Sequence, residues 1–148
     1  MIIPTERLHE FRGLVTMVSG GFDPIHHGHV AYFRAAADLG IPVLCNISHD
    51  AFVGTKHPPL LSHGQRALVI DAFRDIEYVH LARGTTAQVL AELQPRVFVK
   101  GGDWAAGVPA EEEQVCREHG VEIVFLDTVM DSSSRLLEDF LRRHEAAA

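Results

Sequence analysis

The chain has 148 residues, with 13 Lys and Arg against 20 Asp and Glu, which gives a formal net charge of −7. This length predicts one domain whose core needs neither disulfides nor a metal to hold it. The acidic charge argues against a general nucleic-acid binder, which would carry a basic face. No apolar run approaches the roughly 18 residues that span a membrane, and residues 1–7 lack a signal-peptide pattern. Only two cysteines are present, so we expect a reduced, cytoplasmic protein.

Apolar segments alternate with helical patterns along the chain. All-apolar strands that alternate with helices predict an α/β fold, here a single Rossmann-like, doubly wound, five-stranded parallel sheet. We expect this domain to cover residues 14–143, with residues 1–13 as an arm on its surface and residues 144–148 as a frayed tail. The strands are predicted over residues 14–18, 42–47, 78–81, 96–100 and 121–126, and the helices over residues 30–39, 62–73, 85–93, 109–119 and 133–143.

The loop after the first predicted strand lies at the carboxyl end of the sheet, where such folds bind ligands. Gly20 and Gly21 allow close backbone approach to a ligand, and the next helix offers free N–H groups to an anion. His26 and His29 are three residues apart, so their imidazoles can point to one side and donate hydrogen bonds to phosphate oxygens. A metal site is the alternative, but histidines at positions 26, 27 and 29 cannot all converge on one tetrahedral ion. We therefore expect no metal ligand from the protein.

Residues 21–29 read Gly-Phe-Asp-Pro-Ile-His-His-Gly-His, directly after a predicted strand. This pattern resembles the signature of the cytidylyltransferase-like nucleotidyltransferases, relatives of the class I aminoacyl-tRNA synthetases that share an H-x-G-H motif. The resemblance implies transfer of a nucleoside monophosphate from a triphosphate to a small phosphorylated acceptor, with release of pyrophosphate. It also implies a homodimer, with neither nucleic acid nor a membrane as partner. A turn with incidental surface histidines is the alternative interpretation.

Three further segments fit the same family. Residues 46–50, Asn-Ile-Ser-His-Asp, resemble its N-x-S-D element with one histidine inserted. Lys56 resembles the family's lysine that reaches phosphates, although His-Pro-Pro follows it here where glycine is common. Arg66 matches a family arginine at the start of a helix, a position that is electrostatically unfavourable for helix stability. A solvated lysine and a surface ion pair of Arg66 with Asp71 or another acid are the alternatives.

The loops after the fourth and fifth predicted strands complete the resemblance. Residues 99–104, Val-Lys-Gly-Gly-Asp-Trp, resemble the K-G-G-D-[YW] element in the adenylyltransferase domain of bacterial ADP-heptose synthases. Glycerol-3-phosphate cytidylyltransferases carry a similar element with G-D-D-W. Residues 131–136 resemble the family's S-T-T-x-I element, whose hydroxyls and free N–H groups suit terminal phosphates. The cytidylyltransferase branch has an arginine where this chain has Asp127. A tight turn and simple helix capping are the alternatives for these two loops.

The resemblance assigns a role to each matching residue. His26, His29, Lys56 and Arg66 are the expected catalytic residues. Acceptor binding is expected of Asp23, Asp50 and Lys56, and Mg²⁺ is expected to bind mainly through the nucleotide phosphates. The nucleotide, ATP or CTP, is expected to contact Gly20, Gly21, Phe22, Asp23, Gly28, Lys100, Gly101, Gly102, Asp103, Trp104, Ser132, Ser133 and Ser134.

Three functions remain open on these grounds. A sugar-1-phosphate adenylyltransferase of the heptose type is favoured by residues 99–104. A cytidylyltransferase for glycerol-3-phosphate or a similar alcohol phosphate is the second. A nucleotide-binding module without catalysis is the third, and the altered loop after Lys56 keeps it open.

Overall fold

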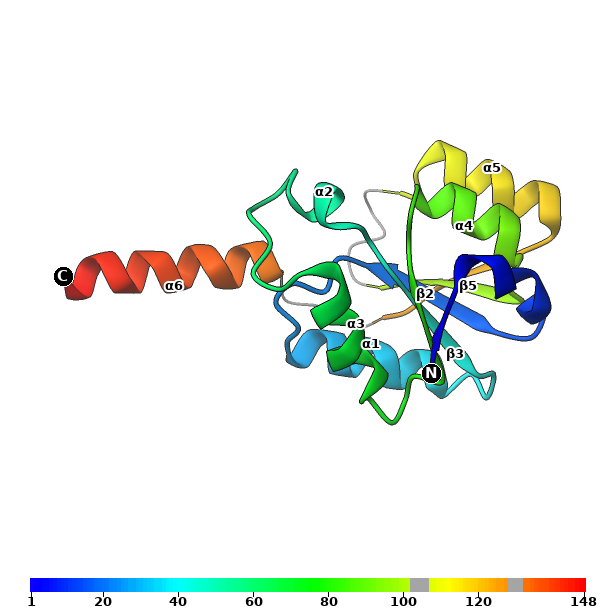
Figure 1. Cartoon of the computed structure of the whole chain (residues 1–148), viewed down its shortest axis with the longest axis horizontal. Helices are drawn as coiled ribbons and strands as arrows, with labels where there is room; N and C mark the ends of the chain where they lie inside the picture. The colour runs from blue at the N-terminus through cyan, green and yellow to red at the C-terminus, as the bar shows by residue number, and fades with distance from the viewer. Residues whose placement is uncertain (102–106, 128–131) are drawn as a thin grey trace.

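The computed structural model describes residues 1–101, 107–127 and 132–148, and over these residues six strands form one parallel sheet (Figure 1). Their order across the sheet is β1-β4-β3-β2-β5-β6. The chain therefore runs outward from β2 in one direction and from β5 in the other, so strand order reverses between these two neighbours. The predicted α/β fold with a parallel sheet is confirmed. The strands are β1 (Ile2–Ile3), β2 (Thr16–Gly20), β3 (Val43–Ile47), β4 (Tyr78–Leu81), β5 (Val97–Lys100) and β6 (Glu122–Phe125).

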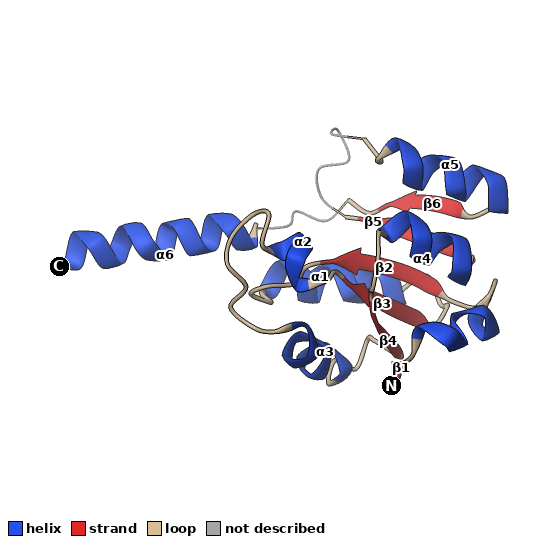
Figure 2. Cartoon of the chain, turned by 45° about the horizontal axis from the view of Figure 1, so that its top comes forward, coloured by secondary structure: helices blue, strands red, loops and turns tan. Residues whose placement is uncertain are grey.

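Helices cover both faces of the sheet (Figure 2). Two of them begin at capping boxes that the sequence displays: the side chain of Ser62 accepts the N–H of Gln65, while Gln65 accepts the N–H of Ser62, and Thr85 and Gln88 repeat the arrangement. The helices are the 3₁₀ helix η1 (Thr5–Phe11), α1 (His27–Ala37), α2 (Asp50–Val53), α3 (His63–Asp71), α4 (Thr86–Leu93), α5 (Ala110–His119) and α6 (Ser133–Ala147). In the described part of the chain, no helix is long and apolar enough to cross a membrane.

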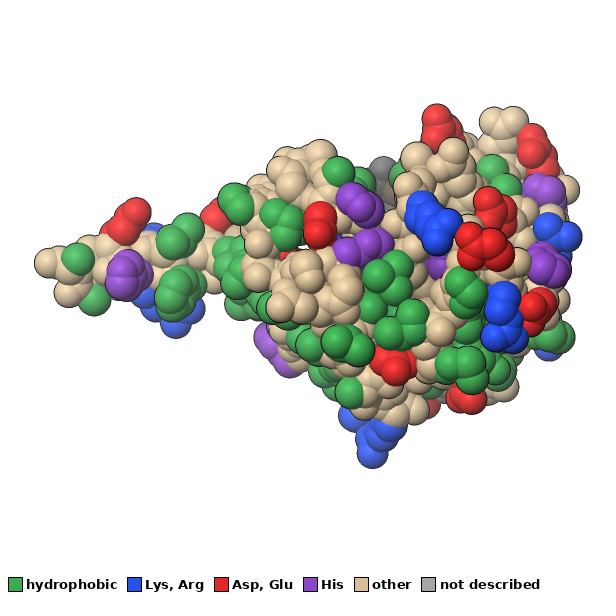
Figure 3. Space-filling view, in the orientation of Figure 1, with side chains coloured by type: hydrophobic (Ala, Val, Ile, Leu, Met, Phe, Trp, Pro, Cys, Tyr) green, Lys and Arg blue, Asp and Glu red, His purple; other side chains and the backbone are tan. Residues whose placement is uncertain are grey.

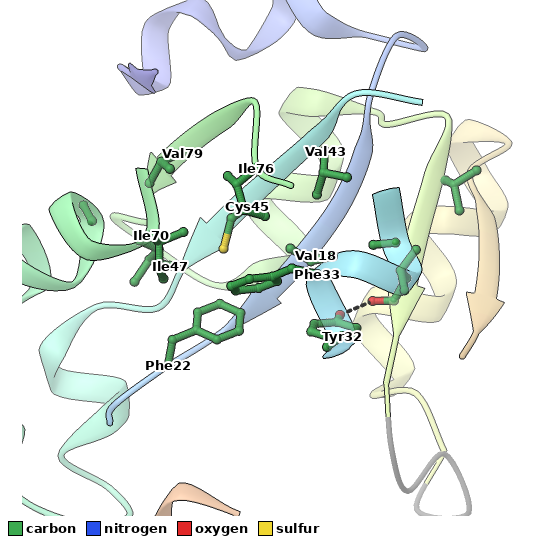
Figure 4. Close-up of a cluster of buried hydrophobic side chains, with 14 residues drawn as sticks. Val18, Phe22, Tyr32, Phe33, Val43, Cys45, Ile47, Ile70, Ile76 and Val79 are labelled. Carbon is green, nitrogen blue, oxygen red and sulfur yellow. Dashed lines mark hydrogen bonds between the residues drawn. The ribbon is translucent and has the colours of Figure 1, made fainter. Parts of the chain in front are cut away.

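Each face of the sheet has its own buried core. Against one face, Phe33 of α1 and Ile70 of α3 pack with strand residues such as Val18 (Figure 4). The hydroxyl of Tyr32 donates to the carbonyl of Val99 at 2.7 Å, so the polar tip of this buried side chain is satisfied. Against the other face, η1, α4 and α5 contribute their apolar side chains. Burial on both faces explains why the central strands are mostly apolar.

The sheet has one strand more than the five that the sequence predicts. The additional strand, β1, pairs Ile2 with Val79 and Ile3 with His80 at the edge of the sheet. A two-residue strand is too short to produce a periodic pattern in the sequence. Leu8 of η1 is also buried, so residues 1–13 complete one edge of the sheet and are more than a surface arm.

The last helix differs from the prediction in length and in placement. The sequence suggests a helix over residues 133–143, whereas α6 continues through Ala147. Its last residues include two alanines, which have the highest helix propensity. α6 projects away from the sheet, and none of its residues is buried (Figure 1).

Candidate active site

A cleft of about 200 Å³ lies at the carboxyl end of β2, where the strand order reverses. Three segments that are far apart in the sequence meet there: the loop after β2, the segment around α2, and the start of α6. The sequence predicts this convergence, because the loops that follow parallel strands share one edge of the sheet. The lining residues are Gly21, Phe22, Asp23, His29, Phe52, Val53, Lys56, His57, Ser132, Ser133 and Ser134.

The loop after β2 is shaped by its aromatic residue. Phe22 adopts a left-handed conformation with φ of 52°, uncommon for a residue other than glycine. Its ring packs edge-on against His29, with 5.0 Å between centroids. A Cβ atom on Gly20 would lie 3.0 Å from this ring, and one on Gly21 would lie 3.1 Å from Val53. The two glycines therefore permit close packing of the loop on itself and on α2.

His26 and His29 cap the first turn of α1. Nδ1 of His26 accepts the N–H of Gly28 at 3.0 Å, and Nδ1 of His29 accepts the N–H of His26 at 3.2 Å. The rings stack with 3.8 Å between centroids and 27° between planes. Because each Nδ1 is an acceptor, the proton of each neutral ring is on Nε2. The motif thus aligns two imidazoles side by side, and it also satisfies backbone groups that a helix start leaves open.

His29 is neutral at physiological pH. Burial, reinforced by the neighbouring His26 and His27, lowers the pKa of His29 to about 3. Its side chain lines the cleft and is only 7% exposed. A neutral imidazole with its proton on Nε2 can donate one hydrogen bond without bringing a charge to the cleft.

Arg66 does not line the cleft, contrary to what a phosphate-binding role requires. It is 1% exposed, and its guanidinium donates to the carbonyls of Gly21 (2.6 Å), Ser48 (2.9 Å) and Leu61 (3.2 Å). It also pairs with Asp50 at 2.5 Å, which is the ion pair with an acid that the sequence left open. Arg66 therefore connects the loops after β2 and β3 to the start of α3.

Asp23 and Asp50 are likewise engaged within the protein. Asp23 is buried, and its two carboxylate oxygens accept the N–H groups of Leu60 (2.7 Å) and Leu61 (3.1 Å). Partial burial raises the pKa of Asp50, but hydrogen bonding to Arg66 outweighs this and holds that pKa below its usual value. We call Asp23, Asp50 and Arg66 the brace, because they fix the loops that surround the cleft.

The two predicted lysines lie in different places. Lys56 lines the cleft, with Nζ 5.3 Å from the centroid of the Phe52 ring. Lys100, at the end of β5, lies 3.4 Å from Glu112 of α5 and is not among the described residues that line the cleft. Gly28 is buried in the first turn of α1, and Gly101 follows β5. Gly102, Asp103 and Trp104 lie outside the described residues.

The serines at the start of α6 line the same cleft as His29. Ser132 caps the helix by accepting the N–H of Arg135 at 3.4 Å. Ser133 donates its hydroxyl to the carbonyl of Pro24 at 2.8 Å, which ties α6 to the loop after β2. The first turn of α6 brings free N–H groups and the positive end of a helix dipole to the cleft. This arrangement suits an anion.

A buried chain of hydrogen bonds lies behind the cleft. The hydroxyl of Thr5 donates to Nε2 of His80 (3.0 Å), and Nδ1 of His80 donates to Asn46 (2.8 Å). Asn46 donates to Ser19 (3.1 Å), whose hydroxyl lies 3.4 Å from that of Thr86. Burial lowers the pKa of His80 to about 4, which keeps the ring neutral. Each hydrogen bond in this series has one donor and one acceptor, so the series holds the end of β2 in place.

Sequence reasoning missed this series of hydrogen bonds and part of the cleft lining. Two polar residues, Asn46 and His80, interrupt otherwise apolar strands, and buried polar groups require partners. That signal was available in the sequence. Phe52 and Val53 reach the cleft through α2, whose four residues are too few to show helical periodicity. Across the described residues, no group of three or more His, Cys, Asp or Glu side chains is arranged to hold a metal ion.

Comparison with known proteins identifies relatives of the whole domain. The family model described as Cytidylyltransferase-like matches residues 17–136. The bifunctional protein HldE of Citrifermentans bemidjiense is 35% identical over 142 residues, which is 91% of this chain and 28% of that protein. HldE of Nitrosococcus oceani is 30% identical over 134 residues, which is 88% of this chain and 28% of that protein. The chain therefore spans just over a quarter of the length of these relatives.

The fold has a counterpart among solved structures. The lipopolysaccharide core biosynthesis protein of Thermoplasma volcanium superimposes with a TM-score of 0.65 at 20% identity, over 78% of this chain and 97% of that one. At this identity the likeness concerns the fold alone. The family model covers most of the chain, including the loop of His26 and His29, and the chain belongs to the cytidylyltransferase-like family of nucleotidyltransferases.

Proposed function

We propose that the chain transfers a nucleoside monophosphate from ATP or CTP to a small phosphorylated acceptor. A phosphate oxygen of the acceptor attacks the α-phosphorus, a new P–O bond forms, and the bond to the bridging oxygen of the β-phosphate breaks. Pyrophosphate leaves with the electron pair of that bond. The observation that carries this proposal is the stacked imidazole pair of His26 and His29, of which His29 lines the same cleft as the start of α6.

Catalysis in this scheme is positioning and charge stabilisation, without a protein nucleophile. The Nε2–H groups of His26 and His29 donate to oxygens of the transferring phosphate and the leaving group. Lys56 neutralises phosphate charge, and Ser132, Ser133 and Ser134 hold the β- and γ-phosphates at the N-terminus of α6. The cleft of about 200 Å³ is smaller than a typical small-molecule site, so it accommodates the phosphates and leaves the base outside.

Mg²⁺ is part of the proposal as the counterion of the triphosphate, whose charge it neutralises. Among the described lining residues, Asp23 has a carboxylate, and both of its oxygens already accept N–H groups. This donor set fits an ion held mainly by nucleotide oxygens and water. The serine hydroxyls at the start of α6 line the same cleft and are the protein oxygens that we propose beside the ion.

The brace supports catalysis indirectly in this proposal. Asp23, Asp50 and Arg66 act as positioning residues, because their charged groups are bonded within the protein. Nucleotide contacts remain proposed for the backbone of the loop after β2, with Gly20, Gly21, Phe22 and Gly28, and for the loop that follows β5, with Lys100, Gly101, Gly102, Asp103 and Trp104.

A heptose-like sugar-1-phosphate adenylyltransferase is the favoured activity. Residues 99–104 and the similarity to HldE proteins support it. A glycerol-3-phosphate-type cytidylyltransferase is the second candidate, and Asp127 counts against it because that branch has an arginine there. A binding module without catalysis is the third. A reducing, cytoplasmic location belongs to the same proposal and is supported by two buried free thiols, Cys45 and Cys116.

A pyrophosphate-release screen tests the proposal. ATP and CTP are each combined with heptose-1-phosphate, other sugar-1-phosphates and glycerol-3-phosphate, in the presence of Mg²⁺. We expect release with ATP and a sugar-1-phosphate, and little with CTP and glycerol-3-phosphate. Release with CTP and glycerol-3-phosphate alone supports the second candidate. Nucleotide binding without pyrophosphate release from any pair contradicts the enzyme proposal and supports the binding module.

A further inference from the structure

The strands β2 and β5 stop pairing with each other before either strand ends. Their register pairs Thr16 with Val97 and Met17 with Phe98, and it goes no further along these two described strands. Each strand continues nevertheless, because β2 is paired with β3 over its whole length and β5 with β6 over its whole length. The ladder therefore ends early on the carboxyl side, between the two strands where the strand order reverses. This is the point at which α/β sheets bind their ligands.

A tyrosine hydroxyl occupies the place of the next ladder bond. If the register continued by one residue, Val18 would lie opposite Val99, and the carbonyl of Val99 would accept the N–H of Ser19. Instead, the hydroxyl of Tyr32 donates to this carbonyl at 2.7 Å (Figure 4). Burial raises the pKa of Tyr32, and a hydrogen bond from the backbone of Ser19 opposes this rise, as an N–H donated to the phenol oxygen does. One hydroxyl thus satisfies a backbone group of each strand.

Tyr32 belongs to α1, the helix that the two histidines cap. It is three residues from His29, so both side chains lie on the same side of the helix. The ring is 3% exposed and lies within the body of the molecule, from which α6 projects (Figure 3). Its partner Val99 comes directly before Lys100 and Gly101, which follow at the end of β5. A single helix therefore fixes the imidazoles and also holds the end of β5.

We infer that Tyr32 is a positioning residue for nucleotide binding, whose hydroxyl keeps the carboxyl ends of β2 and β5 at the separation that the nucleotide requires. The inference rests on the proposed function, in which phosphates bind beside the loop after β2 and further nucleotide contacts come from the segment after β5. A hydroxyl suits this role because it can donate to one strand and accept from the other. The ladder can then end without leaving a buried backbone group unpaired.

Removing this one oxygen tests the inference. In Tyr32→Phe, the N–H of Ser19 and the carbonyl of Val99 can pair with each other, so the ladder gains a bond and the strand ends approach. We expect the urea midpoint to stay close to that of the wild type. Isothermal titration should show the dissociation constants of ATP and CTP with Mg²⁺ raised by about 10-fold, as for loss of one well-placed contact. The matched control is Tyr78→Phe on β4, the other tyrosine of the chain, which should change neither quantity.

A merely structural hydroxyl predicts the opposite pair of results, a lower urea midpoint with unchanged dissociation constants. Circular dichroism at the titration temperature verifies that each variant is folded, so a loss of stability is not mistaken for a loss of affinity. Unchanged dissociation constants in Tyr32→Phe overturn the inference. A marked fall of its urea midpoint also overturns the inference, because the two backbone groups would then have stayed unpaired. A wild type that binds neither nucleotide contradicts the proposed function itself, and the inference falls with it.

Discussion

The cleft lining and the brace contain equally polar side chains that are used in opposite ways. His29, Lys56 and the serines of α6 line the cleft, although Nδ1 of His29 and the hydroxyls of Ser132 and Ser133 also bond within the protein. Asp23, Asp50 and Arg66 direct their charged groups at backbone groups and at each other. All of them belong to segments that resemble the family pattern in the sequence. The difference separates motif residues whose side chains are used up in bonds within the protein, Asp23 among them although it borders the cleft, from motif residues that leave a polar side chain at the cleft.

Burial explains the difference. A charged group removed from water is costly unless it is paired and hydrogen-bonded. Arg66 is 1% exposed and has four bonded acceptors, so its charge is satisfied where it stands. Lys56 is exposed and can keep its charge in water until a phosphate arrives. Removing a brace residue should therefore affect folding first, and removing a lining residue should affect turnover first.

The largest expected effect comes from breaking the brace at Arg66. Arg66→Ala leaves Asp50 and three partly buried carbonyls without their donor, so we expect the free energy of unfolding to fall by about 3–5 kcal/mol. Urea unfolding measures this. The matched control is Arg34→Ala, whose side chain is 55% exposed and whose ion pair is 4.0 Å long, and which should lose less than about 1 kcal/mol.

Arg66→Lys distinguishes the brace from a direct phosphate contact. Lysine keeps the charge but cannot reach four acceptors in the fork geometry of a guanidinium. We expect this variant to be destabilised as well. Unchanged stability together with a large loss of kcat would instead assign Arg66 to the reacting phosphates.

The second effect concerns the lining at His29. Glutamine is the usual partner in a capping box, so His29→Gln keeps an acceptor for the N–H of His26 and preserves the helix start. We expect stability to change little and kcat for pyrophosphate release to fall by about 10²- to 10³-fold, as for loss of a donor to developing charge. His27→Gln is the matched control, because His27 is exposed and lies outside the lining. Equal turnover of the two variants would remove His29 from the chemistry.

The smallest expected effect is a pH dependence of stability, which comes from His80 in the buried series of hydrogen bonds behind the cleft. The pKa of His80 is about 4 in the folded protein, against its usual 6.5. Because the pKa of His80 is lower in the folded protein, the stability contributed by the neutral ring is fully present above about pH 7. This contribution is lost as the pH falls from 6.5 towards 4. At pH 5 this amounts to about 2 kcal/mol. Thermal unfolding from pH 8 to pH 5 should show a shallower slope in His80→Gln, whereas His119→Gln, an exposed histidine on α5, should keep the wild-type slope.

Much of the fold could be predicted because its strands are buried on both faces. Residues 43–45 and 97–99 are apolar throughout, and glycine or a capping side chain marks the neighbouring helices. β1 and α2 could not be predicted, since two or four residues show no period. The placement of α6 depends on what lies beside it, which is outside the reach of a pattern along one chain.

The candidate site divides in the same way. The convergence of residues 21–29 with residues 132–134 follows from the geometry of a parallel sheet, and the sequence predicts it. The role of Asp23 does not follow, because its partners are the backbone N–H groups of Leu60 and Leu61, which have no sequence signature. Arg66 is similar, since three of its four partners are carbonyls. Hydrogen bonds from a side chain to distant backbone groups leave no pattern in a sequence.

The reciprocal cap of His26 and His29 limits what kind of catalyst this loop can be. A backbone N–H occupies each Nδ1, so protonating either ring there would break the helix start. The two rings are therefore unsuited to carry protons between substrate and solvent. Under the proposed function they serve as fixed dipoles aimed at accumulating negative charge, as an oxyanion hole does, but assembled from side chains and held rigid by the helix that they cap.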